Sequence, residues 1–569
     1  MSGMSYYHKP RPNPLVNRRF FEFLDEHKTP DKDLMAFYDD EGKRSSLTFK
    51  KFYDQTRLLA SGLIEQGLGR GDKVLICAPN CFEFAISWLA VNRIGACAVL
   101  QYSGTLTERC ENLLKQLKCE GIVCGLNVNS SHERSRVLQV LAKLVEMRDS
   151  NGARYLRSVV LIGGDEKTTS EIQHDNISTY KDLLIKGAQV VDKLNDVERK
   201  VQCEDYCFSL LSSGTTGQYK AVSYTHHGLV NAINLDVAGG YEEDSVTFSG
   251  WPMAWGSEAP CFAAAVVIGF TFVTAPFSKI TPQDSYHFML KIIQDEKCDD
   301  FHIPQQDIPK MIAENFQEKY DLSSVEGFGY GGQIVPRKCI RSLLNIFPTK
   351  YAVLVYASVE LLTVAIQPLN KESINSECYG RMFILPDIEV KVVDENGLVV
   401  PLGEKGLICA RGAKTFGGYL GNPTATSEVK TKTGWVNTRD YGIMYEGGKL
   451  KVLGREMDII HRGSEKLFPC EFEDILMEHQ DITDAVFVGV PDKILKQELC
   501  ACVIQVPGSD LKSRGSELED WCMERFTVSK GEGMAPKYFV FLDEFPLVEN
   551  SKIDRRAIQK LALEKLSLK

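Results

Sequence analysis

Short apolar runs alternate with amphipathic stretches along the first third of the chain. Residues 74–78 form an apolar run, residues 82–93 have the apolar positions of a helix, and residues 95–100 form a second apolar run. A strand, a helix and a strand at this spacing predict a βαβ unit with two parallel strands. A second round follows, with a helix expected over 107–116 and a strand over 121–124. The pattern therefore predicts an α/β fold with parallel sheets in the large N-terminal part.

The pattern changes toward the C-terminal end. Residues 443–445 and 449–453 alternate apolar and polar positions on either side of a glycine-rich turn, which predicts a hairpin. Beyond this hairpin, strands are expected over 484–490 and 499–506, and a helix over 518–526. These short, mixed elements predict a compact α+β module that is smaller than the part before it.

Length and composition indicate a globular protein with more than one domain. The chain has 569 residues, which exceeds a single typical hydrophobic core. Its net charge of −10 argues against a nucleic-acid-binding surface. Its apolar runs are shorter than the ~18 residues of a membrane span. The 17 cysteines are scattered and form no paired zinc-binding array, so we expect reduced thiols and an intracellular protein.

The cytoplasm is the expected compartment, and mitochondria are left open. The first 21 residues contain four basic residues and no acid, which is a weak sign of mitochondrial targeting. Three prolines and little serine in the same stretch argue against a targeting peptide.

The stretch that carries the most chemistry is rich in glycine and hydroxyl side chains and follows a strand-like run at 207–211. It contains Ser212, Ser213, Gly214, Thr215, Thr216, Gly217 and, three residues later, Lys220. Glycine lets a backbone turn its N–H groups toward a ligand, hydroxyls donate hydrogen bonds, and a lysine adds a mobile positive charge. Such a stretch can wrap a polyphosphate, although it lacks the spacing of a P-loop. From the residues alone, a polar surface loop is an equal alternative.

This stretch resembles the phosphate-binding signature of the adenylate-forming superfamily, which contains acyl-CoA synthetases, beetle luciferases and adenylation domains. That signature reads roughly Thr-Ser-Gly-Thr-Thr-Gly-x-Pro-Lys-Gly. The chain has Tyr219 in place of the proline and Ala221 in place of the last glycine. Neither change removes a group that would face a phosphate. The resemblance implies that the loop, with Lys220, binds the triphosphate of ATP.

Further matches imply where adenine and the acid bind. Gly331, Gly332 and Gln333 match a segment whose backbone lies along the adenine, although a Gly-Gly pair alone is also typical of a plain turn. The residues that the resemblance places at the acid site are Trp255, Ile303, Gly332 and Ala357. For Trp255, packing in the hydrophobic core is an equal alternative when the residue is considered by itself.

Residues 354–360 resemble the motif Tyr-Gly-x-Thr-Glu. The resemblance implies that Tyr356 stacks on adenine and that the carboxylate of Glu360 binds Mg²⁺, a hard cation that prefers oxygen ligands. Ala357 replaces the glycine of the motif and Val359 replaces its threonine. The threonine hydroxyl usually helps to hold the phosphates. Its loss leaves open the alternative that the protein is a slow enzyme or a non-catalytic relative. A plain alternating strand is the alternative without the resemblance.

The C-terminal matches imply roles in both half-reactions. Asp440, expected in the loop before the hairpin, would accept hydrogen bonds from the ribose hydroxyls, and Arg455 would also reach the ribose. Gly463 would let the pantetheine of CoA pass close to the backbone. Lys552 matches the lysine that serves adenylation, where its ammonium group can offset the repulsion between the carboxylate and the α-phosphate. Ser551 stands in place of the glycine before that lysine.

The matches cover nearly the whole chain and resemble the medium-chain type of acyl-CoA synthetase. They imply an N-terminal adenylation domain, 1–454, and a small mobile lid, 455–569. The implied reactants are ATP, CoA and a small-molecule carboxylic acid, with Mg²⁺ as cofactor, and the implied catalytic residues are Lys552, Glu360 and Lys220. Three alternatives stay open: a luciferase-like enzyme, a non-catalytic relative, and an adenylation domain that loads a carrier protein. The oligomeric state is also open.

Overall fold

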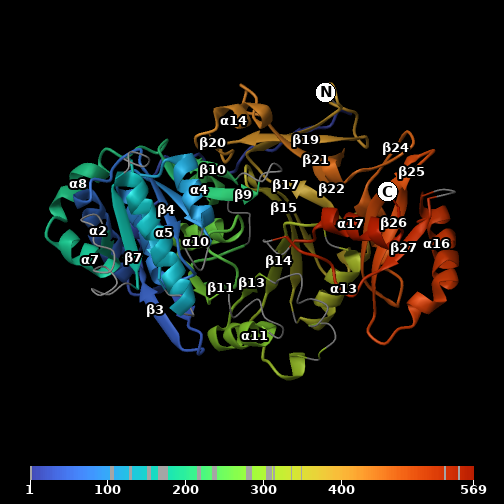
Figure 1. The fold of residues 1–569 in the computed structure, drawn as a ribbon, viewed down its shortest axis with the longest axis horizontal. Coiled ribbons are helices and arrows are strands. Elements are labelled where there is room, and N and C mark those ends of the chain that lie inside the picture. Colours follow the sequence, from blue (N-terminus) through green and yellow to red (C-terminus); the bar gives the residue numbers. More distant parts are fainter. Residues whose placement is uncertain are drawn as a thin grey trace.

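The computed structural model describes most of the chain. The described residues are 3–102, 108–126, 131–149, 155–163, 177–213, 219–233, 240–276, 285–302, 311, 314, 316–334, 336–347, 349–530, 534–548 and 552–568. They form three sheets in the large N-terminal part and a fourth in the C-terminal part, which lies to one side in Figure 1. The predicted α/β fold, with a large domain followed by a small α+β module, is confirmed.

An eight-stranded sheet is built around the predicted βαβ unit. Its order is β20-β10-β9-β5-β4-β6-β7-β8. The strands are β4 (Lys73–Cys77), β5 (Cys97–Gln101), β6 (Gly121–Gly125), β7 (Ser158–Ile162), β8 (Ile177–Thr179), β9 (Tyr206–Ser213), β10 (Tyr219–Thr225) and β20 (Gly418–Tyr419). β4 pairs in parallel with β5 and β6, and α3 (Phe82–Arg93) connects β4 to β5, as the sequence predicts. β5, β6 and β7 are buried along their whole length, which is typical of a parallel sheet that is covered on both faces.

A five-stranded sheet in the order β13-β11-β12-β2-β3 lies beside it. Its strands are β2 (Asp33–Tyr38), β3 (Arg44–Thr48), β11 (Val246–Ser249), β12 (Thr271–Thr274) and β13 (Asp300–Phe301). The helices of this half are α1 (Glu22–Asp25), α2 (Phe49–Glu65), α4 (Glu108–Leu117), α5 (Ser131–Asp149), α7 (Tyr180–Ala188), α8 (Asp192–Glu198), α9 (His226–Ile233), α10 (Glu258–Ile268) and α11 (Ser285–Glu296). Apart from Glu258 at its start, α10 is apolar on every side, and most of it is buried, so it is a core helix.

A nine-stranded sheet completes the large domain, in the order β1-β18-β19-β21-β22-β17-β16-β15-β14. Its strands are β1 (Tyr6–His8), β14 (Gly327–Gly331), β15 (Tyr351–Ser358), β16 (Leu362–Leu369), β17 (Arg381–Ile384), β18 (Ile388–Val393), β19 (Lys405–Gly412), β21 (Val436–Tyr445) and β22 (Lys449–Arg455). The predicted hairpin is β21–β22. Two helices, α13 (Arg337–Ile346) and α14 (Pro423–Val429), accompany this sheet.

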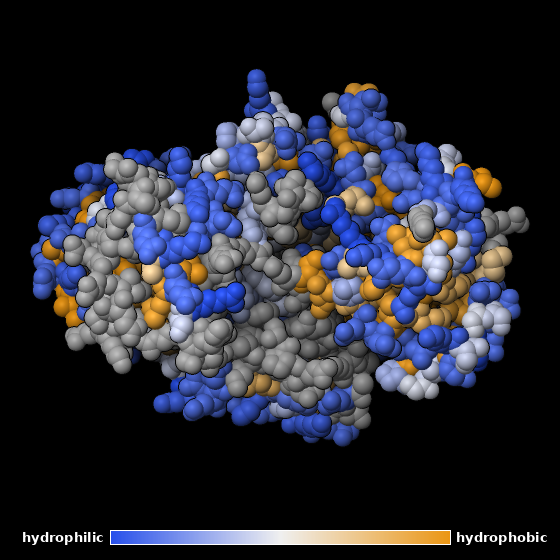
Figure 2. All heavy atoms as spheres, in the orientation of Figure 1, coloured by the Kyte–Doolittle hydropathy of each residue, from blue (hydrophilic) through white to orange (hydrophobic). Residues whose placement is uncertain are grey.

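The C-terminal part has its own sheet and its own hydrophobic core. The sheet contains β23 (Ile460–Arg462), β24 (Glu465–Leu467), β25 (Ile482–Asp492), β26 (Lys496–Gln505) and β27 (Tyr538–Phe541), and the helices are α15 (Pro469–Leu476), α16 (Gly515–Lys530) and α17 (Arg555–Lys565). Two separate clusters of buried apolar side chains lie within this part. On the face seen in Figure 2, hydrophilic side chains line the outer rim of both parts, and apolar ones gather mainly over the C-terminal part.

The two smaller sheets and the nine-stranded sheet meet where the site is built. β11 and β13 are parallel, and β14 is parallel to β15. A parallel bridge between His302, which follows β13, and Gly329 in β14 joins the two pairs. The C-terminal ends of these four strands therefore lie at one edge. In open α/β sheets, ligands bind outside the carboxyl ends of the strands. Within the described ranges, no helix combines the length and the apolar character needed to cross a membrane.

Candidate active site

Tyr419 brings the predicted phosphate lysine and the predicted magnesium carboxylate together. Lys220 lies opposite Ser212 in the β9–β10 hairpin, and its Nζ is 4.8 Å from the centroid of the Tyr419 ring. The Tyr419 hydroxyl donates a hydrogen bond of 2.8 Å to Oε1 of Glu360. Burial, together with the charge of Glu360, raises the pKa of this hydroxyl, so it stays a donor. The cation of Lys220 and the carboxylate of Glu360, which are distant in the sequence, thus both lie next to Tyr419.

The tip of the glycine-rich loop lies outside the described residues. The five residues there are Gly214, Thr215, Thr216, Gly217 and Gln218. The structure describes the two strands that carry this loop, with Ser212 in β9 and Lys220 in β10, and the backbone of Ser213. The role of the loop in phosphate binding stays a prediction.

The segment around Glu360 is fixed by backbone hydrogen bonds. The Phe416 N–H donates to the carbonyl of Glu360 at 2.9 Å, and the Tyr224 hydroxyl donates to the carbonyl of Val359 at 2.6 Å. The carboxylate is only half-buried, so oxygen atoms remain accessible. Across the described ranges, no three His, Cys, Asp or Glu side chains gather in a way that could hold a metal ion by themselves. One carboxylate beside a phosphate-binding site suits Mg²⁺, which takes its other ligands from phosphates and water.

Asp440 lies in a strand, and not in a loop as the sequence predicted. β21 already begins at Val436, because Val436 and Asn437 pair with β19. Asp440 is 6% exposed and accepts a hydrogen bond of 2.8 Å from the Tyr356 hydroxyl at Oδ2. The Nε of Arg455, on the neighbouring strand, is 3.0 Å from Oδ1. Burial raises the pKa of Asp440, and Arg455 and Tyr356 oppose this shift. The Tyr356 hydroxyl and Arg455 thus hold both oxygens of one buried carboxylate.

Lys552 lies against the predicted Gly-Gly segment of the large domain. A Cβ atom on Gly332, whose φ is +87°, would be 3.6 Å from the Lys552 Nζ, and the N–H of the next residue, Ile553, donates to Oε1 of Gln333 at 3.3 Å. Gly331 is also tightly enclosed, since a Cβ there would be 2.9 Å from the carbonyl oxygen of Val355. The C-terminal part therefore occupies a position in which its lysine covers the end of β14.

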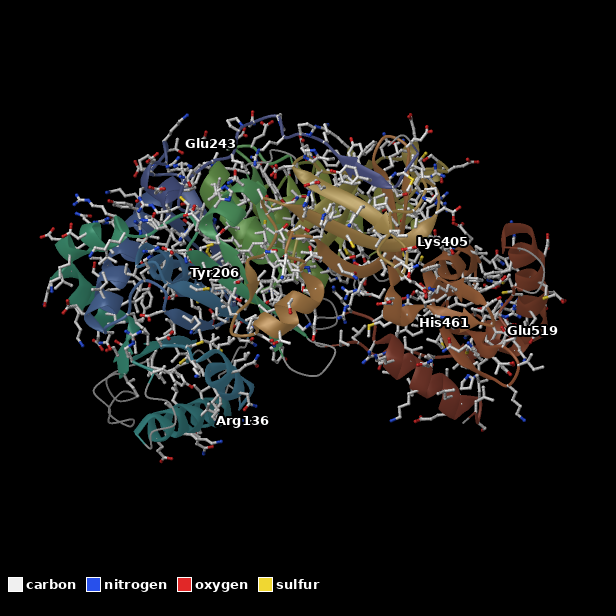
Figure 3. All side chains as sticks on the ribbon, turned by 90° about the horizontal axis from the view of Figure 1, so that it is seen from above. Arg136, Tyr206, Glu243, Lys405, His461 and Glu519 are labelled. Atoms are coloured by element: carbon white, nitrogen blue, oxygen red, sulfur yellow. The ribbon has the colours of Figure 1, made fainter. Side chains whose placement is uncertain are left out.

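This position is held by contacts between the two domains. From α13, the Arg337 N–H donates to Asp474 at 3.0 Å, and the Lys338 Nζ donates to two backbone carbonyls that follow α15. On another side, the Nζ of Lys405 on β19 is 3.0 Å from Glu471 of α15. Figure 3 shows Lys405 at the border of the large domain, facing the C-terminal part that carries His461 and Glu519. Together these contacts hold the C-terminal part against the large domain on two sides.

The remaining predicted residues are placed less directly. Trp255 stacks on Trp251 with the ring centroids 4.8 Å apart, in the segment before α10. The neighbouring Gly256 lies against Val359, which links this segment to the Glu360 region. Ala357 is exposed on β15, and Ile303 lies outside the described residues. Gly463, with φ of +64°, directly follows β23, and its N–H donates to the carbonyl of Leu495 at 2.7 Å within the C-terminal part.

Two features of this region escaped the sequence analysis. Tyr419 was missed because a lone tyrosine in a glycine-rich segment has no periodic or spacing signal. A second set of polar side chains, Ser249, Glu258 and His302, was missed because each lies in a largely apolar segment and they meet only in the folded chain. Long-range contacts of this kind are not visible in local patterns.

A pH dependence follows from the environment of Lys552. Burial of the ammonium group, and then the charge of Arg455, lower its pKa, while Asp440 opposes the shift. The ammonium form exists below this pKa and is lost above it. We therefore expect ATP–pyrophosphate exchange to decline with rising pH at a lower pH than an ordinary lysine would give. Lys552→Arg, which stays charged, should lack this alkaline decline, and an identical decline in that variant would contradict the assignment.

A large α/β domain with a lysine and a carboxylate at the strand ends, covered by a lysine from a small second domain, defines an adenylate-forming enzyme. The family models agree. A model described as "AMP-binding enzyme" matches residues 24–420, and one described as "AMP-binding enzyme C-terminal domain" matches residues 471–552. The first match covers well over half of the chain, so the chain belongs to the AMP-binding enzyme family.

Curated relatives and solved structures span nearly the whole chain. The "Medium-chain acyl-CoA ligase ACSF2, mitochondrial" of Danio rerio is 27% identical over 573 residues, which cover 99% of this chain and 91% of the relative. The putative acyl-CoA synthetase YngI of Bacillus subtilis is 25% identical, over 95% of this chain and 96% of its own. The crystal structure of the anthranilate CoA ligase AuaEII with anthranoyl-AMP has a TM-score of 0.77 at 19% identity, over 98% of this chain and 99% of the other. The predicted resemblance to an acyl-CoA synthetase of the medium-chain type is confirmed.

Proposed function

We propose that this AMP-forming acid–thiol ligase activates a medium-chain carboxylic acid with ATP and transfers the acyl group to CoA. One observation carries the proposal. Lys552 of the C-terminal part lies over Gly332, close enough to Asp440 and Arg455 for their charges to shift its pKa. A lysine in that position can contact a carboxylate and an α-phosphate held at the strand ends.

In the first half-reaction, two anions must meet. An oxygen of the acid's carboxylate attacks the α-phosphorus of ATP, the bond to the bridging oxygen breaks, and pyrophosphate leaves with that electron pair. Lys552 offsets the repulsion between the carboxylate and the α-phosphate, and Lys220 stabilises the negative charge on the β- and γ-phosphates. Asp440, whose oxygens contact Tyr356 and Arg455, is the residue that we propose accepts hydrogen bonds from the ribose hydroxyls.

Mg²⁺ fits the carboxylate of Glu360. The side chain is partly accessible and has the Tyr419 hydroxyl on one oxygen. A bound Mg²⁺ would neutralise charge on the phosphates. Tyr419 would then orient Glu360 while Lys220 stays next to the tyrosine ring, so the same three side chains serve both the metal and the triphosphate.

In the second half-reaction, the CoA thiol, after loss of its proton, attacks the acyl carbonyl carbon of the acyl-adenylate, the C–O bond of the mixed anhydride breaks, and AMP leaves with that oxygen and its electron pair. Lys552 has no role in that step, so we propose that the lid turns and presents Gly463 to the pantetheine. We propose a domain boundary between 454 and 455, with the hinge at 455–458. Two facts support it: β22 ends at Arg455, and the sheet of the C-terminal part begins at Ile460.

The medium-chain preference is supported by the ACSF2 relatives at 23–27% identity. Their names also place them in mitochondria, so we propose an intracellular site of action, either the cytoplasm or the mitochondrion. The partner is a small-molecule carboxylic acid.

ATP–pyrophosphate exchange tests the proposal directly. Saturated acids from butyrate to palmitate, together with benzoate, should be compared in kcat/KM, first for exchange and then for CoA-dependent AMP release. We expect a maximum at medium chain length and CoA-dependent release with the same acids. Exchange with none of the acids, in a protein that still binds ATP, would instead identify a non-catalytic relative.

A further inference from the structure

A buried ion pair lies at the C-terminal ends of β11 and β13. Glu258, the first residue of α10, has no solvent exposure and accepts a hydrogen bond from the Ser249 hydroxyl at the end of β11. Its other oxygen, Oε1, is 3.1 Å from Nδ1 of His302, which follows β13. A fully buried carboxylate needs such partners, because an unpaired buried charge is strongly unfavourable.

The pair lies at the strand edge where we propose that the acid binds. A Cβ on Gly329 would be 3.6 Å from Cδ2 and 3.7 Å from Nε2 of His302, and Gly329 stands two residues before Gly331 on β14. Glu258 stands two residues after Gly256, which lies against Val359. The imidazole therefore lies between the segment before α10 and the strand that ends under Lys552.

His302 carries a positive charge at neutral pH. Burial lowers its pKa, but Glu258 and Asp300 outweigh this effect and raise the pKa to about 9. The pKa of Glu258, which burial alone would raise, is lowered by the same pair. Asp300 accepts a hydrogen bond of 3.0 Å from the Tyr241 hydroxyl, and burial raises its pKa to about 6. The positive charge of the imidazolium is thus balanced by the carboxylate of Glu258, and Asp300 is a second carboxyl group nearby.

One donor of this imidazolium is not used by the described part of the protein. Nδ1 serves Glu258, whereas no hydrogen bond joins Nε2 to any described residue, and the side chain is 21% exposed. A histidine that only anchored α10 could be fully enclosed, whereas the His302 side chain keeps part of its surface accessible. Protonated histidine donates from both nitrogens, so Nε2 presents a charged donor to whatever occupies this edge.

We propose that His302 is a specificity-determining residue whose Nε2–H donates a hydrogen bond to a hydroxyl or keto oxygen carried on the chain of the acid. This inference rests on the proposed function and narrows its substrate class to oxygenated acids. A second carboxylate on the acid would face Glu258 and Asp300 with only one cation between them. The charge balance therefore favours a neutral oxygen over a dicarboxylic acid.

A substrate comparison on the full-length enzyme tests this. CoA-dependent AMP release should be measured with the saturated acid that gives the highest exchange rate. The same assay is then run on its monohydroxy and monoketo derivatives, substituted near the carboxylate, in mid-chain or at the end, and on the dicarboxylic acid of equal length. We expect kcat/KM of at least one neutral oxygenated acid to exceed that of the plain acid by about tenfold or more, the usual size of a hydrogen bond to a charged donor. A plain acid or a dicarboxylic acid that outperforms all of them would overturn the inference.

Two variants identify the residue responsible. His302→Leu removes the donor but strands Glu258, so the double variant His302→Leu with Glu258→Leu removes both charges together. In each, the ratio of kcat/KM for the oxygenated acid to that for the plain acid should fall to about one. Because both rates come from one preparation, a reduced folded fraction cancels from this ratio. If the ratio stays high in both variants, the role of His302 is wrong. If none of the acids supports CoA-dependent AMP release, even in the wild type, the proposed function itself is wrong.

Discussion

Lys552→Ala will slow ATP–pyrophosphate exchange by about 10²–10³-fold, the usual effect of removing one preorganised group that stabilises transition-state charge. The physical reason is that this ammonium group lies over Gly332, where the carboxylate and the α-phosphate must approach each other. Thioester formation from a chemically supplied acyl-adenylate should change only a few-fold, because no anion pair has to be formed in that step. The two rates are measured separately on one enzyme preparation.

Lys560→Ala is the matched control, since Lys560 is an exposed lysine on α17 of the same domain. It should leave both half-reactions unchanged. If Lys552→Ala lowered both half-reactions equally, the lysine would act on folding or on lid position in general. The separate role in adenylation would then be wrong.

The balance of charge around Lys552 explains why the lid has to move. Arg455 and burial both disfavour the ammonium group, and only Asp440 compensates among the groups that shift its pKa. The site without reactants therefore holds excess positive charge at the strand ends. An incoming triphosphate and carboxylate relieve this excess, whereas the acyl-adenylate that remains after loss of pyrophosphate relieves it less. Departure of pyrophosphate thus weakens the contact that keeps Lys552 in place.

Local patterns predicted the elements but not all of their contacts. The helix at 82–93 was predicted to the residue, because it is a largely apolar segment bounded by turn-forming residues. Asp440 was expected in a loop because the alternation of the hairpin starts only at 443. The pairing of Val436 with β19 extends the strand, and that partner is distant in sequence.

The site was predictable where a motif fixes neighbouring residues and not where side chains meet across the fold. Glu360 and Lys220 were found through separate motifs, but nothing in either motif indicates Tyr419, which joins them. The same holds for Glu258 and His302, whose proximity depends on β11 and β13 lying side by side. Tertiary pairing of strands, rather than local propensity, decides both cases.

Glu360→Gln should reduce ATP–pyrophosphate exchange by about 10²-fold at a fixed, moderate Mg²⁺ concentration, since a metal that neutralises phosphate charge contributes several kcal/mol to such a step. Glutamine keeps the size of the side chain and an oxygen that can accept from Tyr419, so the change removes charge and little else. The Mg²⁺ concentration for half-maximal exchange should rise, and excess Mg²⁺ should restore part of the rate. Both are read from exchange rates across an Mg²⁺ titration.

Glu372→Gln, at an exposed glutamate of the same sheet region, is the control and should leave the Mg²⁺ titration unchanged. Tyr419→Phe separates orientation from ligation: it keeps the carboxylate but removes its hydrogen bond, so a smaller shift, about tenfold, is expected in the Mg²⁺ requirement. A titration curve for Glu360→Gln that overlays the wild-type curve would show that the metal is bound elsewhere. The link from Lys220 through Tyr419 to Glu360 would then only hold β10, β20 and the end of β15 together.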